Sequence, residues 1–125
     1  MEKKKFDREE AMSLIARGEI DKLLDFDLRG ADLRDANLCD ADLHHADLRG
    51  ANLCDADIDY ACWPLWCGGL HVKIDKYIAC QLAYHFCNQD CDDSEYIAAR
   101  NAILNFANQF RRAEECGLLE PRNTR

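Results

Sequence analysis

The sequence predicts a mainly β solenoid with α-helical caps, and three observations carry this prediction. Residues 26–65 divide into eight five-residue units: FDLRG, ADLRD, ANLCD, ADLHH, ADLRG, ANLCD, ADIDY and ACWPL. An aliphatic residue is central in seven of the units, and Ala stands two places before the centre in all but the first. The segments on either side lack this period and carry helical patterns instead.

A period of five suits neither a straight helix nor a straight strand. On a helix, successive central residues are rotated by about 140° and form no stripe. On a strand, an odd spacing places them on opposite faces. One inward face forms only if the chain turns a corner at every unit, so that short extended sides stack around a Leu and Ala interior. Gly30 and Gly50 stand at the last place of a unit, where a corner favours glycine.

The number of sides per turn does not follow from the period. Residues 31–40 match residues 46–55 at nine of ten positions, an offset of 15 that suits a three-sided coil. The A(D/N)LXX pattern of the units resembles the pentapeptide repeat family, and the helical tail resembles the extension of short bacterial and phage-borne members. This resemblance implies a right-handed, four-sided β-helix of about two coils. The offset of 15 is then interpreted as a duplication of three units.

Residues 1–25 are expected to form an N-terminal capping helix and a lead-in to the first turn. Asp7 can cap the helix with Glu10 three residues on, and Gly18 can end it. The helix would cover the open end of the solenoid, which exposes apolar side chains and unpaired edges. At the other end the regular coil is expected to fail near Tyr60.

Residues 66–125 are expected to form a C-terminal helical extension, so that the chain is one compact unit in three sequential parts. One helix is predicted from Asp75 to about Asn88, and a second from Asp92, as its cap, to about Glu115. The seam of the second alternates steps of three and four, which is typical of helix pairing: Tyr96, Ala99, Ile103, Phe106, Phe110 and Ala113. Seam surface left uncovered in the monomer favours a homodimer through these helices.

Composition excludes several classes of protein. The formal net charge of −8 argues against partners that attract basic surfaces, so we expect no nucleic acid and no membrane as partner. No apolar run approaches the roughly 20 residues of a membrane span, and the N-terminus lacks a secretion signal. Eight cysteines in such a chain indicate free thiols and a cytoplasmic location.

The thiols supply the one candidate metal site. Cys62 and Cys67 lie close in sequence, and Cys87 and Cys91 lie near His85. Zinc needs four Cys or His ligands, and tight structural sites prefer shorter spacings than these. The cysteines are better interpreted as small buried apolar residues, so no metal and no cofactor is predicted.

No catalytic residue is predicted either. His44 and His45 form a doublet that should point outward at a corner, a few residues after Cys39. No acid or nucleophile is placed with them as a catalytic group requires. We therefore expect a protein that is not an enzyme.

Asp or Asn precedes the central residue in all units but the last, and we interpret these side chains as satisfying the backbone. They also make acidic rows, and the resemblance implies an alternative function on that ground. Some pentapeptide repeat proteins imitate DNA and bind a type II topoisomerase such as gyrase. Two turns span roughly 10 Å, about three base pairs of duplex, which is short for such a mimic. The leading hypothesis is a non-enzymatic interaction or scaffold module with an unknown protein partner.

Overall fold

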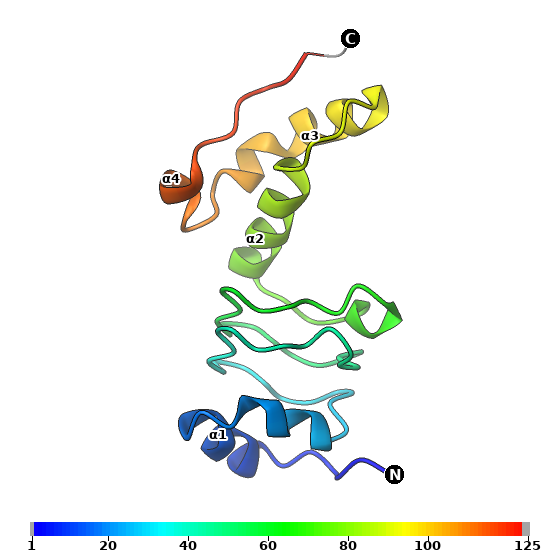
Figure 1. Cartoon of the computed structure of the whole chain (residues 1–125), viewed down its shortest axis with the longest axis vertical. Helices are drawn as coiled ribbons and strands as arrows, with labels where there is room; N and C mark the ends of the chain where they lie inside the picture. Colours follow the sequence, from blue (N-terminus) through cyan, green and yellow to red (C-terminus); the bar gives the residue numbers. More distant parts are fainter. Residues whose placement is uncertain (1, 124–125) are drawn as a thin grey trace. The chain divides into compact units, whose positions relative to one another are not determined.

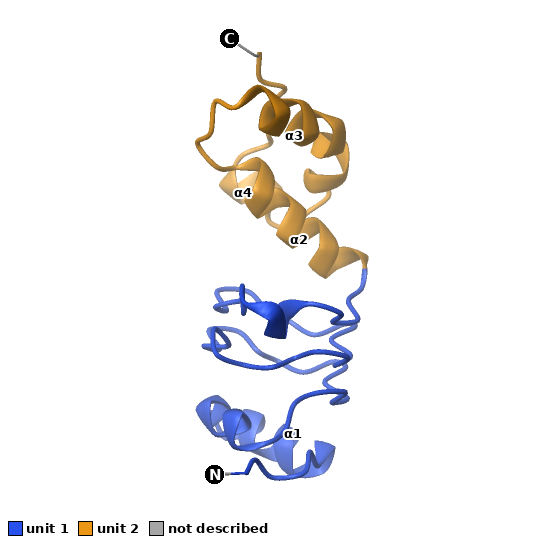
Figure 2. Cartoon of the chain, turned by 90° about the vertical axis from the view of Figure 1, so that its right-hand side faces the viewer, with its two compact units in different colours: residues 1–75 blue, residues 76–125 orange. Residues whose placement is uncertain are grey.

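The computed structural model describes residues 2–123 and divides into two compact units (Figures 1 and 2). The first unit spans residues 1–75 and the second residues 76–125. The helices in chain order are α1 (Arg8–Ala16), the 3₁₀ helices η1 (Ile20–Asp25) and η2 (Cys67–Gly69), α2 (Lys76–Cys87), α3 (Ser94–Ala107) and α4 (Ala113–Cys116). Within residues 2–123, every helix is too short or too polar to span a membrane. The three-part division at residues 25 and 65 stays a prediction.

The repeats wind into a coil whose regular turns each take 20 residues. Isolated parallel bridges pair residues at this distance: Asp32 with Asn52, Asn37 with Asp57, and Asp42 with Cys62. A turn therefore takes four units, and the offset of 15 seen in the sequence is not the length of a turn. The central aliphatic residues all point inward and are at most 7% exposed: Leu28, Leu33, Leu38, Leu43, Leu48, Leu53 and Ile58.

The predicted fold class, a mainly β solenoid in the form of a right-handed four-sided β-helix, is wrong. Residues 2–123 contain no β-strand and no sheet, and the turns of the coil are joined only by isolated bridges. A single residue of each side pairs with the next turn before the chain reaches a corner. The pairing thus never extends to the consecutive residues that make a strand, and the helices are the longest elements of this part of the chain.

Six corners of the coil have a positive φ at the last place of the unit. Gly30 and Gly50, with φ of 70° and 76°, adopt this conformation without strain. At the other four corners, side-chain-bearing residues take φ of 61° to 64°: Asp35, Asp40, Asp55 and Tyr60. Asp tolerates this region better than most residues, because its short polar side chain can bond locally.

The coil does not fail near Tyr60, as the sequence predicted, but continues to Lys73 with one extra residue. Asn52 bridges Lys73, an offset of 73 − 52 = 21. The N–H of Leu53 donates to the carbonyl of Lys73 at 2.8 Å, where regular turns place the acceptor 19 residues on. The 3₁₀ helix η2 lies within this longer turn.

The N-terminal cap forms as the sequence predicts. The Asp7 side chain accepts a hydrogen bond from the N–H of Glu10, and Gly18 follows the helix with a φ of 76°. Lys4 then pairs with the first turn of the coil: its N–H donates to Asp25 at 2.8 Å, and its carbonyl accepts from Asp27 at 2.7 Å. The N-terminal segment thus supplies partners to the backbone of the first turn.

The second unit packs α2 against α3, but not through the predicted seam. The buried face of α3 is one residue further on and consists of Ile97, Arg100, Leu104 and Ala107. Ile103 and Phe106 of the predicted seam are 38% and 37% exposed. The helix is also shorter than predicted, because the chain turns after Ala107 and only resumes as α4. Its cap is Asp93 rather than Asp92.

Candidate functional site

The outer layer of the coil is built from the Asp or Asn before each central residue. In all seven regular units its Oδ1 accepts a hydrogen bond from the backbone N–H two residues on, at 3.0–3.3 Å. This confirms the interpretation that these side chains satisfy the backbone. Each bond fixes the approach to a corner, so the outward side chains are held in a defined direction.

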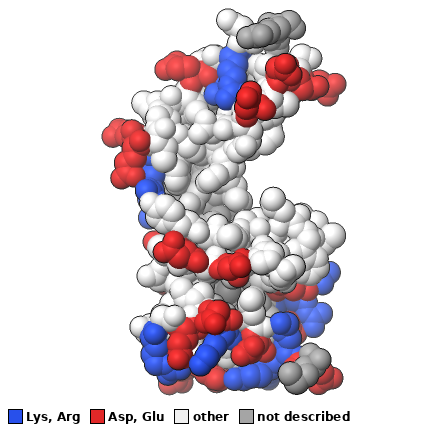
Figure 3. All heavy atoms as spheres, in the orientation of Figure 1, with Lys and Arg blue, Asp and Glu red and all other residues white. Residues whose placement is uncertain are grey.

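Three of these carboxylates also pair with an arginine two residues on. Arg29, Arg34 and Arg49 each bind the aspartate of their own unit, at 2.9, 2.8 and 2.6 Å. The Arg29 hydrogen bond lowers the pKa of Asp27 to about 2. The face shown in Figure 3 accordingly mixes acidic and basic side chains around the N-terminal half of the first unit. The acidic rows are thus partly neutralised at their source.

One side of the coil lacks the backbone pairing found on its other sides. In the regular pattern the central N–H donates to the residue 19 further on, as Leu33 does to Asn52 and Leu38 to Asp57. Among the described residues, no backbone hydrogen bond joins residues 26–28 to residues 46–48. The first and second turns are therefore unpaired along this side, although Gly30 donates to Arg49 at the next corner, at 2.9 Å.

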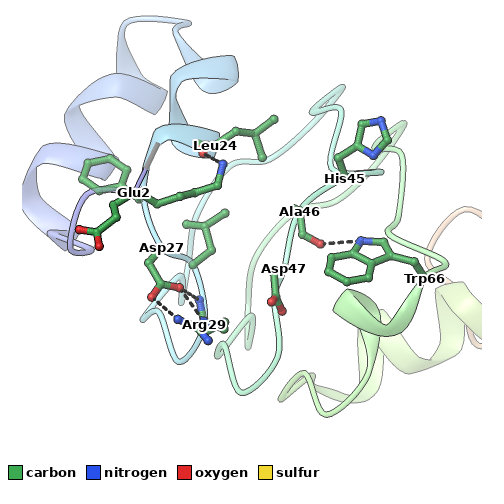
Figure 4. Close-up of a pocket in the computed structure, with 11 residues that line it drawn as sticks. Glu2, Leu24, Asp27, Arg29, His45, Ala46, Asp47 and Trp66 are labelled. Atoms are coloured by element: carbon green, nitrogen blue, oxygen red, sulfur yellow. Dashed lines mark hydrogen bonds and ion pairs between the residues drawn. The ribbon is translucent and has the colours of Figure 1, made fainter.

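A hollow of about 560 Å³ opens at this unpaired side (Figure 4). Leu24 and Asp27 lie on one wall, and Ala46 and Trp66 on the other. Apolar and charged side chains share the lining: Glu2, Lys3, Leu24, Phe26, Asp27, Leu28, Arg29, His45, Ala46, Asp47 and Trp66. We call this the coil hollow. It combines unpaired backbone edges with an aromatic ring, which are features that recognise an extended peptide.

Trp66 is fixed in the hollow by an unusual substitution in the backbone pattern. Its indole Nε1 donates to the carbonyl of Ala46 at 3.0 Å, where a backbone N–H binds at the other sides of the coil. The following glycines make room for this fold. A Cβ at Gly68 would lie 2.5 Å from the Ala46 carbonyl oxygen, and one at Gly69 would lie 2.0 Å from that of Pro64. Sequence reasoning read the glycines as a break and missed the hollow.

His44 and His45 lie at a corner, with their ring centroids 3.9 Å apart. His44 Nδ1 contacts the carboxylate of Asp42, and Cys39 lines the same second hollow of about 450 Å³. A Cys, a His and an Asp thus share one surface. The Cys39 thiol is poorly suited to be a nucleophile, because the Asp57 carboxylate and burial raise its pKa to about 11. The arrangement favours a thiol that stays protonated.

The candidate zinc ligands are not gathered into one site. All eight cysteines are free thiols. Cys62 and Cys67 belong to the first unit and Cys87 and Cys91 to the second, as does His85. Cys87 is fully buried and bonds the Arg100 carbonyl. Within the described residues, no three His, Cys, Asp or Glu side chains are grouped so that they could hold a metal ion.

The stacked five-residue units define a repeat protein. A family model of pentapeptide repeats matches residues 25–61 with eight copies, so over this segment the chain belongs to the pentapeptide repeats. This confirms the family that the A(D/N)LXX pattern indicated, and it suggests a repeat-based protein-interaction module. A comparison with curated proteins found no match, and neither did one with solved structures.

Proposed function

We propose that the chain is a non-enzymatic protein–protein interaction or scaffold module that binds its partner at the coil hollow. The observation that carries this proposal is the unpaired side between residues 26–28 and 46–48. A coil held by hydrogen bonds on its other sides offers free backbone groups only there. Trp66, which is 45% exposed, places an aromatic ring beside them. Aromatic side chains at the centre of a contact supply much of its binding energy.

The partner that fits is a protein with an extended segment. Backbone N–H and C=O groups at an open edge bind another backbone, as in strand addition, while neighbouring pockets select side chains. Lys3, Asp27, Arg29 and Asp47 surround the apolar part of the hollow with both signs of charge. Such a rim contributes orientation and specificity more than affinity.

A photo-crosslinking amino acid at position 66 tests this proposal in a host lysate. The matched control places the same group at position 65, which is 94% exposed and does not line the hollow. We expect a discrete crosslinked product from position 66 and none from position 65. Identical background patterns at both positions would count against the hollow as a binding site.

We further propose a cytoplasmic protein with no nucleic acid and no membrane as partner. The formal net charge of −8 and the eight free thiols support this setting. DNA mimicry of a topoisomerase substrate is disfavoured, because Arg29, Arg34 and Arg49 neutralise carboxylates of the same coil. A supercoiling assay with excess protein separates the two functions, and we expect no inhibition.

A homodimer through the C-terminal helices is a second proposal, favoured by one observation on α3. Ile103 and Phe106 follow the predicted seam yet remain 38% and 37% exposed. Tyr96 of the same seam is partly buried beside Phe86, with ring centroids 5.1 Å apart. A twofold contact would cover this apolar strip. Light scattering tests the proposal, and a mass of 14.3 kDa at every concentration would contradict it.

A further inference from the structure

The C-terminal tail, residues 118–122, runs along α3 and is held there through its backbone. The Asn108 side chain both donates to the carbonyl of Leu119 and accepts from its N–H, each at 2.9 Å. Asn101 does the same for Arg122, at 2.7 and 3.0 Å. Each asparagine thus brackets the backbone of one tail residue with two hydrogen bonds.

The spacing of the two asparagines matches an extended chain. Seven residues of α-helix separate them, a rise of about 10.5 Å. Three residues separate Leu119 from Arg122, and they span about 9.3 Å in a polyproline II conformation or about 10 Å in a strand. Pro121 lies between the bracketed residues, where its lack of an N–H removes no bond. The asparagines therefore read an extended backbone at a fixed period.

Arg100 makes the surface beneath the tail depend on a backbone being there. It is only 2% exposed, and its guanidinium donates to the carbonyls of Cys87 at 2.6 Å and Glu120 at 2.7 Å. Its other recorded partner is the Asn101 side chain, at 3.1 Å. A buried cation without its acceptors is strongly unfavourable. We call Arg100, Asn101 and Asn108 the tail groove, and removing Glu120 from it leaves that cation short of an acceptor.

A single glycine returns the tail to the groove of its own chain. Gly117 has φ 114° and ψ 125°, a region that side-chain-bearing residues rarely adopt. No atom lies within 4 Å of a Cβ built at this position, so the glycine is needed for its conformation and not for space. Leu119 then packs against the buried cluster that contains Tyr84, Cys87 and Ala107.

We propose that the tail groove also binds the tail of a second copy of this chain, so that two helical units join by exchanging residues 118–122. The groove recognises backbone atoms and one leucine, and a second copy presents the same segment with the same spacing. Exchange keeps every bond of Arg100, Asn101 and Asn108 and changes only the path of the chain at Gly117. Exchange of an identical element is a low-cost route to a dimer. This inference rests on the proposed homodimer and specifies how its helices join.

The test is the full-length variant Gly117→Val, studied by light scattering over a concentration series. Valine meets no atom at this position but is strained at φ 114°, so it disfavours the return of the tail by about tenfold or more. An exchanged dimer relieves two such hinges, so we expect its association constant to rise about a hundredfold over wild type. The matched control is Gly18→Val, which has φ 76°, equally open surroundings and no tail. We expect it to leave the mass unchanged.

A groove variant separates tail exchange from other dimers. Asn101→Asp with Asn108→Asp keeps the side-chain volume but removes the two donors to the tail carbonyls. Combined with Gly117→Val, it should return the protein to a monomer with α-helical circular dichroism. A Gly117→Val protein that stays monomeric at every concentration overturns the inference. So does a dimer that survives the groove variant; if Ile103→Glu then dissociates it, the α3 face alone holds the homodimer.

Discussion

Leu38→Ala tests whether the interior of the coil is rigid. Leu38 is fully buried, and its N–H donates to Asp57 at 2.8 Å while its carbonyl accepts from Ala41 at 3.1 Å. Removing three buried carbon groups at about 0.8 kcal/mol each costs about 2.4 kcal/mol. Because these backbone bonds hold the turns apart, the coil cannot close on the cavity. We therefore expect the free energy of unfolding to fall by about 3–5 kcal/mol, in the upper part of the range for such substitutions.

Urea unfolding followed by tryptophan fluorescence measures this loss in the right unit. Both tryptophans, Trp63 and Trp66, belong to the first unit, so their emission reports the coil and not the helical unit. The matched control is Leu65→Ala, where the side chain is 94% exposed and the expected change is within about 0.5 kcal/mol. Equal losses at positions 38 and 65, or a loss below about 1 kcal/mol at position 38, would refute the reasoning.

Three further predictions concern a close approach, a strained corner and a thiol. Gly69→Ala places a Cβ 2.0 Å from the Pro64 carbonyl oxygen, so the urea midpoint of the coil should fall by the equivalent of about 1–3 kcal/mol. Tyr60→Gly releases a left-handed corner with φ 61° and should raise the stability of the coil by about 0.5–1 kcal/mol, seen as a higher Tm. Cys39 should react slowly with an alkylating reagent at pH 9, since its pKa is raised to about 11, and Asp57→Asn should speed that reaction. Stability gained from a raised thiol pKa is full below pH 9 and lost as the pH rises through about 11, so a Cys39 that reacts at the same rate in both proteins would contradict this account.

The sequence was a good guide wherever a local pattern decides the structure. The inward Leu and Ala follow from the five-residue period, and the cap at Asp7 follows from its spacing to Glu10. The strands did not follow, because a period of five sets the corners so close that a side pairs through one residue only. Propensity and burial were right, and the extent of pairing was not.

The α3 face shows a different limit of sequence reasoning. Two residue sets on this helix share the three-and-four spacing, and the one with more apolar residues was chosen. The buried set contains Arg100, whose charge argued against it. Its acceptors, the carbonyls of Cys87 and Glu120, are 13 and 20 residues away and carry no sequence signature. Backbone carbonyls can hold a buried guanidinium, and a residue pattern does not reveal where they gather.

The coil hollow was beyond reach for the same kind of reason. Residues 26–30 and 46–50 read FDLRG and ADLRG, nearly the same unit, and nothing in them marks an unpaired side. Trp66 and the two glycines are visible in the sequence, but their role depends on a carbonyl 20 residues earlier. A site made from missing bonds has no motif of its own.

The 20-residue revolution gives the internal duplication an unexpected geometric outcome. A copy displaced by 15 residues falls one edge short of a full circuit, so the twin segments 31–40 and 46–55 occupy neighbouring edges instead of lying above one another. Arg34 and Arg49 therefore face different directions, and Cys39 and Cys54 do as well. Copying three pentads spreads one surface chemistry around the column, whereas copying four would have thickened a single stripe.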